Sequence, residues 1–117
     1  MSAEAVIARQ LDAYNARDIA AFMACWAPNA QMLAHPDTLL ASGHDEIRAR
    51  HVLRFQEPDL HAELLSRTVL DNRVVDRERV TRNFPEGKGR VDVVAIYEVL
   101  GGLITRAWFI TGTPVFA

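Results

Sequence analysis

Two neighbouring segments, LDAYNARDI at residues 11–19 and FMACWAPNA at residues 22–30, set the start of this fold. Apolar residues recur at helical spacing up to and through the first segment, which predicts a helix over residues 3–16. The residues on this stripe are Val6, Ile7, Leu11 and Tyr14. The step from Asn15 to Asp18 then breaks the pattern, so the chain is expected to turn before a second helix begins.

The second segment continues the helical spacing behind an aspartate that can cap a helix. Asp18 precedes an apolar stripe, which consists of Ile19, Phe22, Met23 and Trp26. Pro28 and Asn29 are expected to end this second helix. Residues 30–35 then read as a short strand, with residues 39–41 as the returning arm of a hairpin.

The remainder of the chain predicts one more helix and then a meander of strands. Apolar spacing favours the third helix over residues 45–55. Strands are predicted at residues 60–70, 74–84, 90–100 and 103–111. The first of them loses its alternation at Leu64-Leu65, which suggests a bulge, and residues 85–89 form a hairpin loop. The fold class is therefore α+β: three N-terminal helices pack on the concave face of a curved antiparallel β-sheet, and the resulting cone encloses a pocket.

The composition bounds the function of the chain. With 117 residues, 50% hydrophobic and 24% charged, residues 1–117 are expected to form a single domain. The net charge of −2 gives no general attraction to nucleic acid, and no apolar run is long enough for a membrane span. Cys25 is the only cysteine, so we expect no internal disulfide and a cytoplasmic location. A core of this size also favours a homodimer, which we expect to form through the sheet face.

The same segments resemble the opening of the nuclear transport factor 2-like superfamily, which contains the ketosteroid isomerases (steroid delta-isomerases) and the SnoaL-like polyketide cyclases. The Asn15-x-x-Asp18 break and the WAPNA entry to the first strand are typical of it. GHDEIR at residues 43–48 resembles the start of its third helix, and residues 94–99 and 104–109 resemble its last strands. The resemblance implies a cone-shaped barrel with a deep pocket for a small hydrophobic molecule, commonly in a homodimer. It does not imply one activity, because this fold serves isomerases, dehydratases, hydrolases, cyclases and non-catalytic binders.

Motif alignment carries the isomerase site of the family over to a few residues of this chain. The base at the end of the first strand falls on His35, and histidine is a residue type suited to that task near neutral pH. The tyrosine of the oxyanion hole falls on Gln10 and the late-strand aspartate on Ala95, which argues against ordinary ketosteroid isomerase activity. His51 falls where isomerases place a pocket-lining tyrosine. The alternatives are that His35 hydrogen-bonds loop backbone and that His51 is an exposed helix residue.

Two carboxylates on one predicted strand have two interpretations. Asp76 and Glu78 share one strand face, whereas Arg77 points to the other. If the first face lines the cone, burial and mutual repulsion raise the pKa of one carboxyl and give it acid–base capacity. If that face is outward, the carboxylates pair with arginines such as Arg67 across the sheet, and this second interpretation is the more common for such alternation. Family members similar to limonene epoxide hydrolase use an Asp-Arg-Asp set, with which the run Asp76-Arg77-Glu78 invites comparison.

These observations predict a cofactor-free enzyme that transfers a proton on a small hydrophobic compound, as an isomerase, cyclase or dehydratase does. The candidate catalytic residues are His35 as the base, with His51 or Glu78 as its partner. The candidate ligand-binding residues are Gln10, Tyr14, Trp26, Phe55, Tyr97 and Trp108, of which the aromatic ones can equally be core. His44 and His51 are seven positions apart, which does not match metal-ligand spacing, so no metal is expected. The alternative is a non-catalytic dimeric module that binds a metabolite or only closes its core.

Overall fold

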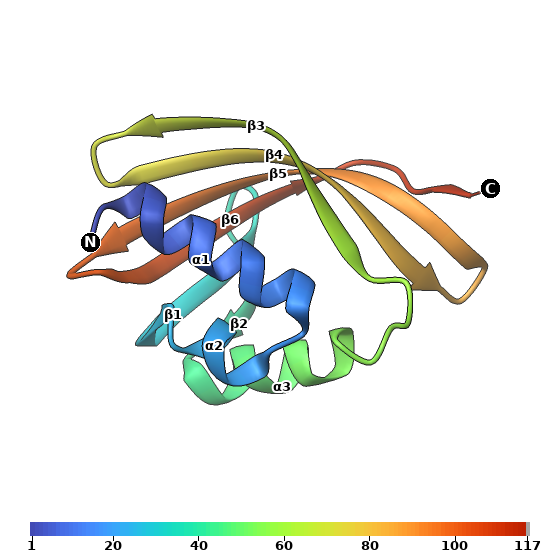
Figure 1. Cartoon of the computed structure of the whole chain (residues 1–117), viewed down its shortest axis with the longest axis horizontal. Helices are drawn as coiled ribbons and strands as arrows, with labels where there is room; N and C mark the ends of the chain where they lie inside the picture. The colour runs from blue at the N-terminus through green and yellow to red at the C-terminus, as the bar shows by residue number, and fades with distance from the viewer. Residues whose placement is uncertain (117) are drawn as a thin grey trace.

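The computed structural model describes residues 1–116, which form three helices and a curved sheet of seven strands (Figure 1). The helices are α1 (Ala3–Ala16), α2 (Ile19–Met23) and α3 (His44–Arg54). The strands are β1 (Trp26–Ala34), β2 (Thr38–Ser42), β3 (His61–Leu70), β4 (Arg73–Phe84), β5 (Gly87–Leu100), β6 (Leu103–Thr111) and β7 (Val115–Phe116). None of the helices within residues 1–116 is long and apolar enough to cross a membrane.

The sheet is mixed and open, with β2 and β3 as its edge strands. Its strand order is β2-β1-β6-β5-β4-β3, and β7 pairs with β5. β1 runs parallel to β6, whereas the other strand pairs are antiparallel. In Figure 1 the helices all lie on one side of the sheet, which curls around them. The predicted α+β class with helices on the concave face is therefore confirmed, and so is the bulge in β3, where the register jumps between Leu64 and Ser66.

The step between Asn15 and Asp18 ties three elements together. Asn15 Nδ2 donates to the carbonyl oxygen of Ala62 at 2.9 Å, and the Ala62 N–H donates back to Asn15 Oδ1 at 2.8 Å. This pair of hydrogen bonds fixes the end of α1 to the start of β3. The Asp18 carboxylate caps α2, because it accepts a hydrogen bond from the N–H of Ala21 at 3.1 Å. The helix break therefore fixes the start of β3 against the end of α1, next to the capped start of α2.

Some element boundaries differ from the prediction. α2 ends at Met23, and Trp26 begins β1 instead of extending the helical stripe. The carbonyl of Cys25 accepts a hydrogen bond from the N–H of Ile104 at 2.8 Å, so pairing with β6 replaces the last helical turn. β5 already begins at Gly87, which shortens the predicted hairpin loop. The short strand β7 was not predicted.

Two groups of buried apolar residues fill the space between the helices and the sheet. The larger group includes Ile7, Phe22, Met32, Ile47 and Ile104, and the smaller one consists of Leu60, Ala62, Val80 and Val91. Tyr14 and Phe55 pack against both groups. Tyr14 also borders a cavity that the two groups leave unfilled.

Candidate functional site

A cavity of about 250 Å³ lies between the helices and the concave face of the sheet. Its apolar wall includes Leu11, Phe22, Met32, Val80, Val93 and Phe109. Polar side chains reach it from α1, α3, β4 and β5. A cavity of roughly 150 Å³ in another protein holds benzene, so this one has room for a compound of one or two rings.

The cavity brings most of the predicted site residues together, namely Gln10, Tyr14, Trp26, His51, Glu78 and Tyr97. It does not include His35 or Trp108. His35 is exposed after the end of β1, where its N–H donates to the carbonyl of Phe109 at 2.9 Å. Trp108 lies opposite Ile96 of β5, on the sheet face away from the buried Ala107. The structure thus separates His35 from the other two candidate catalytic residues.

Asp76 and Glu78 turn their side chains to the inside of the sheet. Asp76 is fully buried and Glu78 is 7% exposed. Arg67 of β3 holds Asp76 with two hydrogen bonds, from Nε to Oδ1 at 2.7 Å and from Nη2 to Oδ2 at 2.9 Å. The outward orientation favoured from the charge alternation is therefore wrong. The physical reason is that Val74 and Val80 share this strand face, and their burial places the two carboxylates inside with them.

Glu78 has the environment of a group that exchanges protons near neutral pH. Burial, and next the charge of Asp76, raise the pKa of Glu78 from 4.5 to about 7, while Arg67 acts in the opposite direction. Efficient general acid–base catalysis needs a group whose pKa lies close to the working pH. The Glu78 carboxyl meets this requirement, and it borders the cavity.

His51 is held in one tautomer. Its Nδ1 lies 2.8 Å from the carbonyl oxygen of Ile47, which can only accept, so Nδ1 carries the hydrogen and Nε2 is an acceptor. Burial lowers the pKa of His51 to about 4, with the hydrogen bond to Ile47 opposing and the charge of Arg54 adding to this shift. The ring centre lies 4.4 Å from that of Phe22 and 5.8 Å from that of Phe55. Phe55 does not line the cavity, so it acts on the site by packing against His51.

The wall also holds three uncharged polar groups. Burial, and next the charge of Glu78, raise the pKa of Tyr97 well above its usual value, so its hydroxyl stays a neutral donor. Gln10 Oε1 and Trp26 Nε1 are buried and have no hydrogen-bond partner among the described residues. An unpaired buried polar atom costs about 1–3 kcal/mol, so a ligand that offers it a partner gains binding energy.

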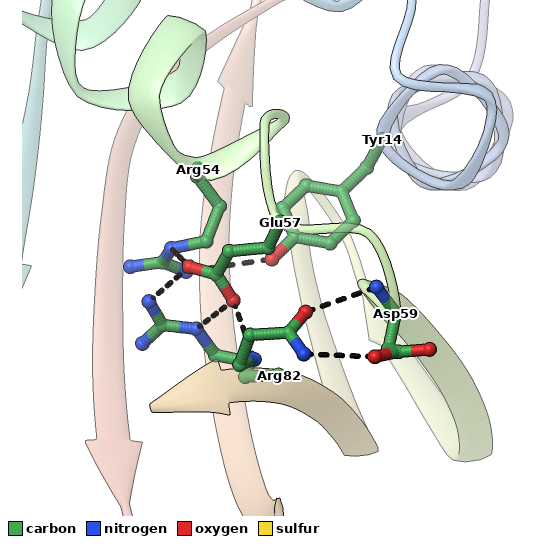
Figure 2. A network of polar contacts seen from close by, with 6 residues as sticks. Tyr14, Arg54, Glu57, Asp59 and Arg82 are labelled. Atoms are coloured by element: carbon green, nitrogen blue, oxygen red, sulfur yellow. Dashed lines mark hydrogen bonds and ion pairs between the residues drawn. The ribbon is translucent and has the colours of Figure 1, made fainter. Parts of the chain in front are cut away.

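Three arginines gather at one side of the cavity, and Figure 2 shows two of them. Arg82 donates to Glu57 twice, from Nε to Oε1 at 3.2 Å and from Nη2 to Oε2 at 2.6 Å. Arg54 Nε lies 3.7 Å from the same carboxylate, and Arg54 Nη1 donates to the hydroxyl of Tyr14 at 3.4 Å. Arg50 is the third. We refer to these residues, Arg50, Arg54 and Arg82, as the arginine cluster.

The sequence analysis named Arg67 as a partner of the two carboxylates, although on the outer face, and it missed the arginine cluster. Arg67 is the partner of Asp76 because the β3–β4 register places these two residues opposite each other. Arg77, the arginine of the run compared with the Asp-Arg-Asp set, lies on the strand face opposite the two carboxylates as predicted, with 58% of its side chain exposed. The signal for the arginine cluster was available, since Arg50 and Arg54 are four positions apart and share one face of a helix.

The pKa shifts of Glu78 and His51 predict opposite effects of pH on stability. Glu78 has a raised pKa in the folded state, so its stabilising contribution is complete below pH 4.5 and is lost as the pH rises to about 7. His51 has a lowered pKa, so its contribution is complete above pH 6.5 and is lost as the pH falls to about 4. Between about pH 4.5 and pH 6.5, a rise in pH therefore reduces the stabilising contribution of Glu78 and increases that of His51.

The variant Glu78→Gln separates the contribution of Glu78 from that of His51. The glutamine does not ionise, so the variant does not lose stability through this position as the pH rises. We therefore expect the free energy of unfolding of the variant, minus that of the wild type, to increase by about 2–3 kcal/mol from pH 4.5 to pH 7. Urea unfolding at several pH values measures this difference. Glu86→Gln, at an exposed turn position, is the matched control and should show a flat difference. A flat difference for Glu78→Gln would contradict the assigned environment of Glu78.

Comparisons with known proteins agree with this architecture. Residues 7–107 match the family model of the SnoaL-like domain. A search of curated proteins finds no match to the chain. Among solved structures, an uncharacterised cystatin-fold protein from Novosphingobium aromaticivorans is 27% identical, with a TM-score of 0.87 over 94% of this chain and 98% of that one.

Two further solved structures are alike in fold alone. The proposed polyketide cyclase IdmH from Streptomyces antibioticus is 17% identical, with a TM-score of 0.79 over 95% of this chain and 92% of that one. A proposed ketosteroid isomerase from Kribbella flavida is 15% identical, with a TM-score of 0.80 over 98% and 81% of the two chains. Because the family model spans most of the chain, the protein belongs to the SnoaL-like domain family.

Proposed function

We propose that this protein binds a small, mainly apolar compound in the cavity and that Glu78 transfers a proton on it without a cofactor. The observation that carries the proposal is a buried carboxyl with a pKa of about 7 at the wall of a cavity of about 250 Å³. Relatives in fold that are named as polyketide cyclases and ketosteroid isomerases support this class of chemistry.

The residues around Glu78 have distinct parts in such a step. Ionised Glu78 takes a proton from a carbon next to a carbonyl group; the electrons of the broken C–H bond form the enolate, and the protonated carboxyl can return the proton to another carbon. The Tyr97 hydroxyl, kept neutral by its raised pKa, donates to the developing oxyanion. The negative charge of Asp76 makes Glu78 a stronger base, and Arg67 keeps Asp76 paired.

The experiment uses 5-nitrobenzisoxazole, a small ring compound that reports on a carboxylate base in an apolar site. Glu78 would remove the ring C–H proton, the C–H electrons would form the nitrile, and the N–O bond would break to release a nitrophenolate. We expect ring opening above the buffer rate, with a pH–rate profile that rises to half its maximum at about pH 7. The absorbance of the nitrophenolate follows the reaction.

The result also separates the enzyme from its alternative. A rate that does not depend on pH, or one with its midpoint at the pH of an ordinary carboxyl, would contradict the role of Glu78. If the compound stabilises the fold against heat but does not react, a non-catalytic binding module is the better description.

A further inference from the structure

The arginine cluster carries more positive charge than the neighbouring acidic residues neutralise. Glu57 is the carboxylate that pairs with two of its members, Arg82 at 2.6 Å and Arg54 at 3.7 Å. Asp59 has partners of its own, since it accepts from Asn83 Nδ2 at 2.8 Å and lies 3.7 Å from Lys88 Nζ. Figure 2 shows Asp59 on the side of this network away from Arg54.

Arg50 is the member that faces the cavity without a counter-charge among the described residues. Its pKa is lowered by burial and next by the charges of Arg54 and Arg82, as expected for a cation beside other cations. The acid one turn earlier on α3, Glu46, accepts instead from the N–H of Ser42 at 2.9 Å. Three guanidinium groups and one carboxylate leave this side of the cavity with an excess of two positive charges.

The two charged parts of the cavity act on different titratable groups, with Tyr14 as the group that both affect. The charges that act on Glu78 are those of Asp76 and Arg67, and those that act on His51 are those of Arg54 and Arg50. Burial raises the pKa of Tyr14, and the charges of Arg54, Arg82 and Glu78 also affect it. A ligand in the cavity can therefore place one group near Glu78 and another near the arginine cluster. A guanidinium group is planar and matches the two oxygens of a carboxylate with two N–H donors.

We propose that the arginine cluster, and Arg50 above all, binds the carboxylate of a ligand whose apolar ring lies in the cavity. The substrate class is then a small apolar carboxylic acid. This inference rests on the proposed function for the location of the ring, and it adds the charged group that the ligand carries.

The test compares an uncharged and a charged derivative of one ring system. The affinities for 2-naphthamide and for 2-naphthoate are measured by isothermal titration calorimetry at pH 7. We expect wild-type protein to bind naphthoate at least about tenfold more tightly, because a charge-assisted hydrogen bond strengthens binding by that order. Arg50→Gln should reduce the ratio of the two affinities to within about twofold. Arg48 and Arg50 are both exposed residues of α3, but only Arg50 lines the cavity, so Arg48→Gln removes the same charge from the same helix and should keep the preference.

Each outcome decides the inference. Equal affinities in the wild type, no binding of either compound, or an equal loss in Arg48→Gln and Arg50→Gln would overturn it. Glu78→Gln should keep the preference for naphthoate, which distinguishes this inference from the proposed function. A preference for naphthoate without ring opening of 5-nitrobenzisoxazole would support the carboxylate site and contradict the proton-transfer role of Glu78.

Discussion

Replacing Glu78 with glutamine is expected to lower the rate of 5-nitrobenzisoxazole ring opening at pH 7 by at least about 100-fold. The reason is that a positioned general base typically contributes about 100- to 10,000-fold, and the glutamine amide cannot take up the proton. The fold should persist, because glutamine has the shape of the protonated carboxyl that burial already favours at this position. Initial rates and the urea midpoint, measured on the same preparation, check both parts.

Two further variants make this result specific. Glu86→Gln changes the net charge in the same way at an exposed turn and should keep the wild-type rate. His35→Ala tests the base that motif alignment selected from the sequence. If His35→Ala lost the activity while Glu78→Gln retained it, the base would be His35, and the role assigned to Glu78 would have to be given up.

The second large effect is a loss of stability in the variant Arg67→Ala. Asp76 is fully buried and Arg67 is its bidentate partner, so the variant leaves a buried charge without compensation. Breaking such a pair costs about 3–5 kcal/mol in the free energy of unfolding at pH 7. The charge of Arg67 also holds the pKa of Glu78 down, so the midpoint of the pH–rate profile should move above pH 7 in any folded variant.

An ion pair at the surface serves as the control for the loss of stability expected in Arg67→Ala. Arg73 pairs with Glu98 at 3.0 Å, but its side chain is 46% exposed, so Arg73→Ala should cost less than about 1 kcal/mol. If Arg67→Ala fails to fold, the double variant Arg67→Met with Asp76→Leu should regain most of the stability, because it removes both charges. An Arg67→Ala protein no less stable than Arg73→Ala would refute the structural role of the buried pair.

The helices and the meander could be predicted because their apolar residues repeat at one regular period. α1 and β6 have the predicted bounds, residues 3–16 and 103–111. β1 has no such period, since its register against β6 shifts between Trp26 and Gln31, and its burial does not alternate. The helical spacing of Phe22 and Trp26 therefore continued past the true helix end. Only the hydrogen bonds to β6, distant in sequence, determine where the strand starts.

The candidate site was harder to predict, because charge alternation is symmetric between the two faces of a strand. In β4, Asp76 and Glu78 alternate with arginines, and only the flanking Val74 and Val80 indicate which face is buried. Trp108 was placed in the pocket by its type, but its neighbour Ala107 is the residue that faces the helices. The homodimer and the cytoplasmic location stay predictions.

The placement of Arg50 and Arg54 on α3, and of Asp76 and Glu78 on β4, has a consequence for how such a protein can diversify. Apart from Arg82, which shares β4 with Glu78, the side chains proposed to bind the ligand and those proposed to move the proton belong to different elements, so the α3 set can vary without disturbing the reaction centre. Substitutions along the cavity face of α3 are then a route to new specificities on an unchanged reaction centre. The same modularity would let a designer randomise positions 50 and 54 and still select for one chemistry.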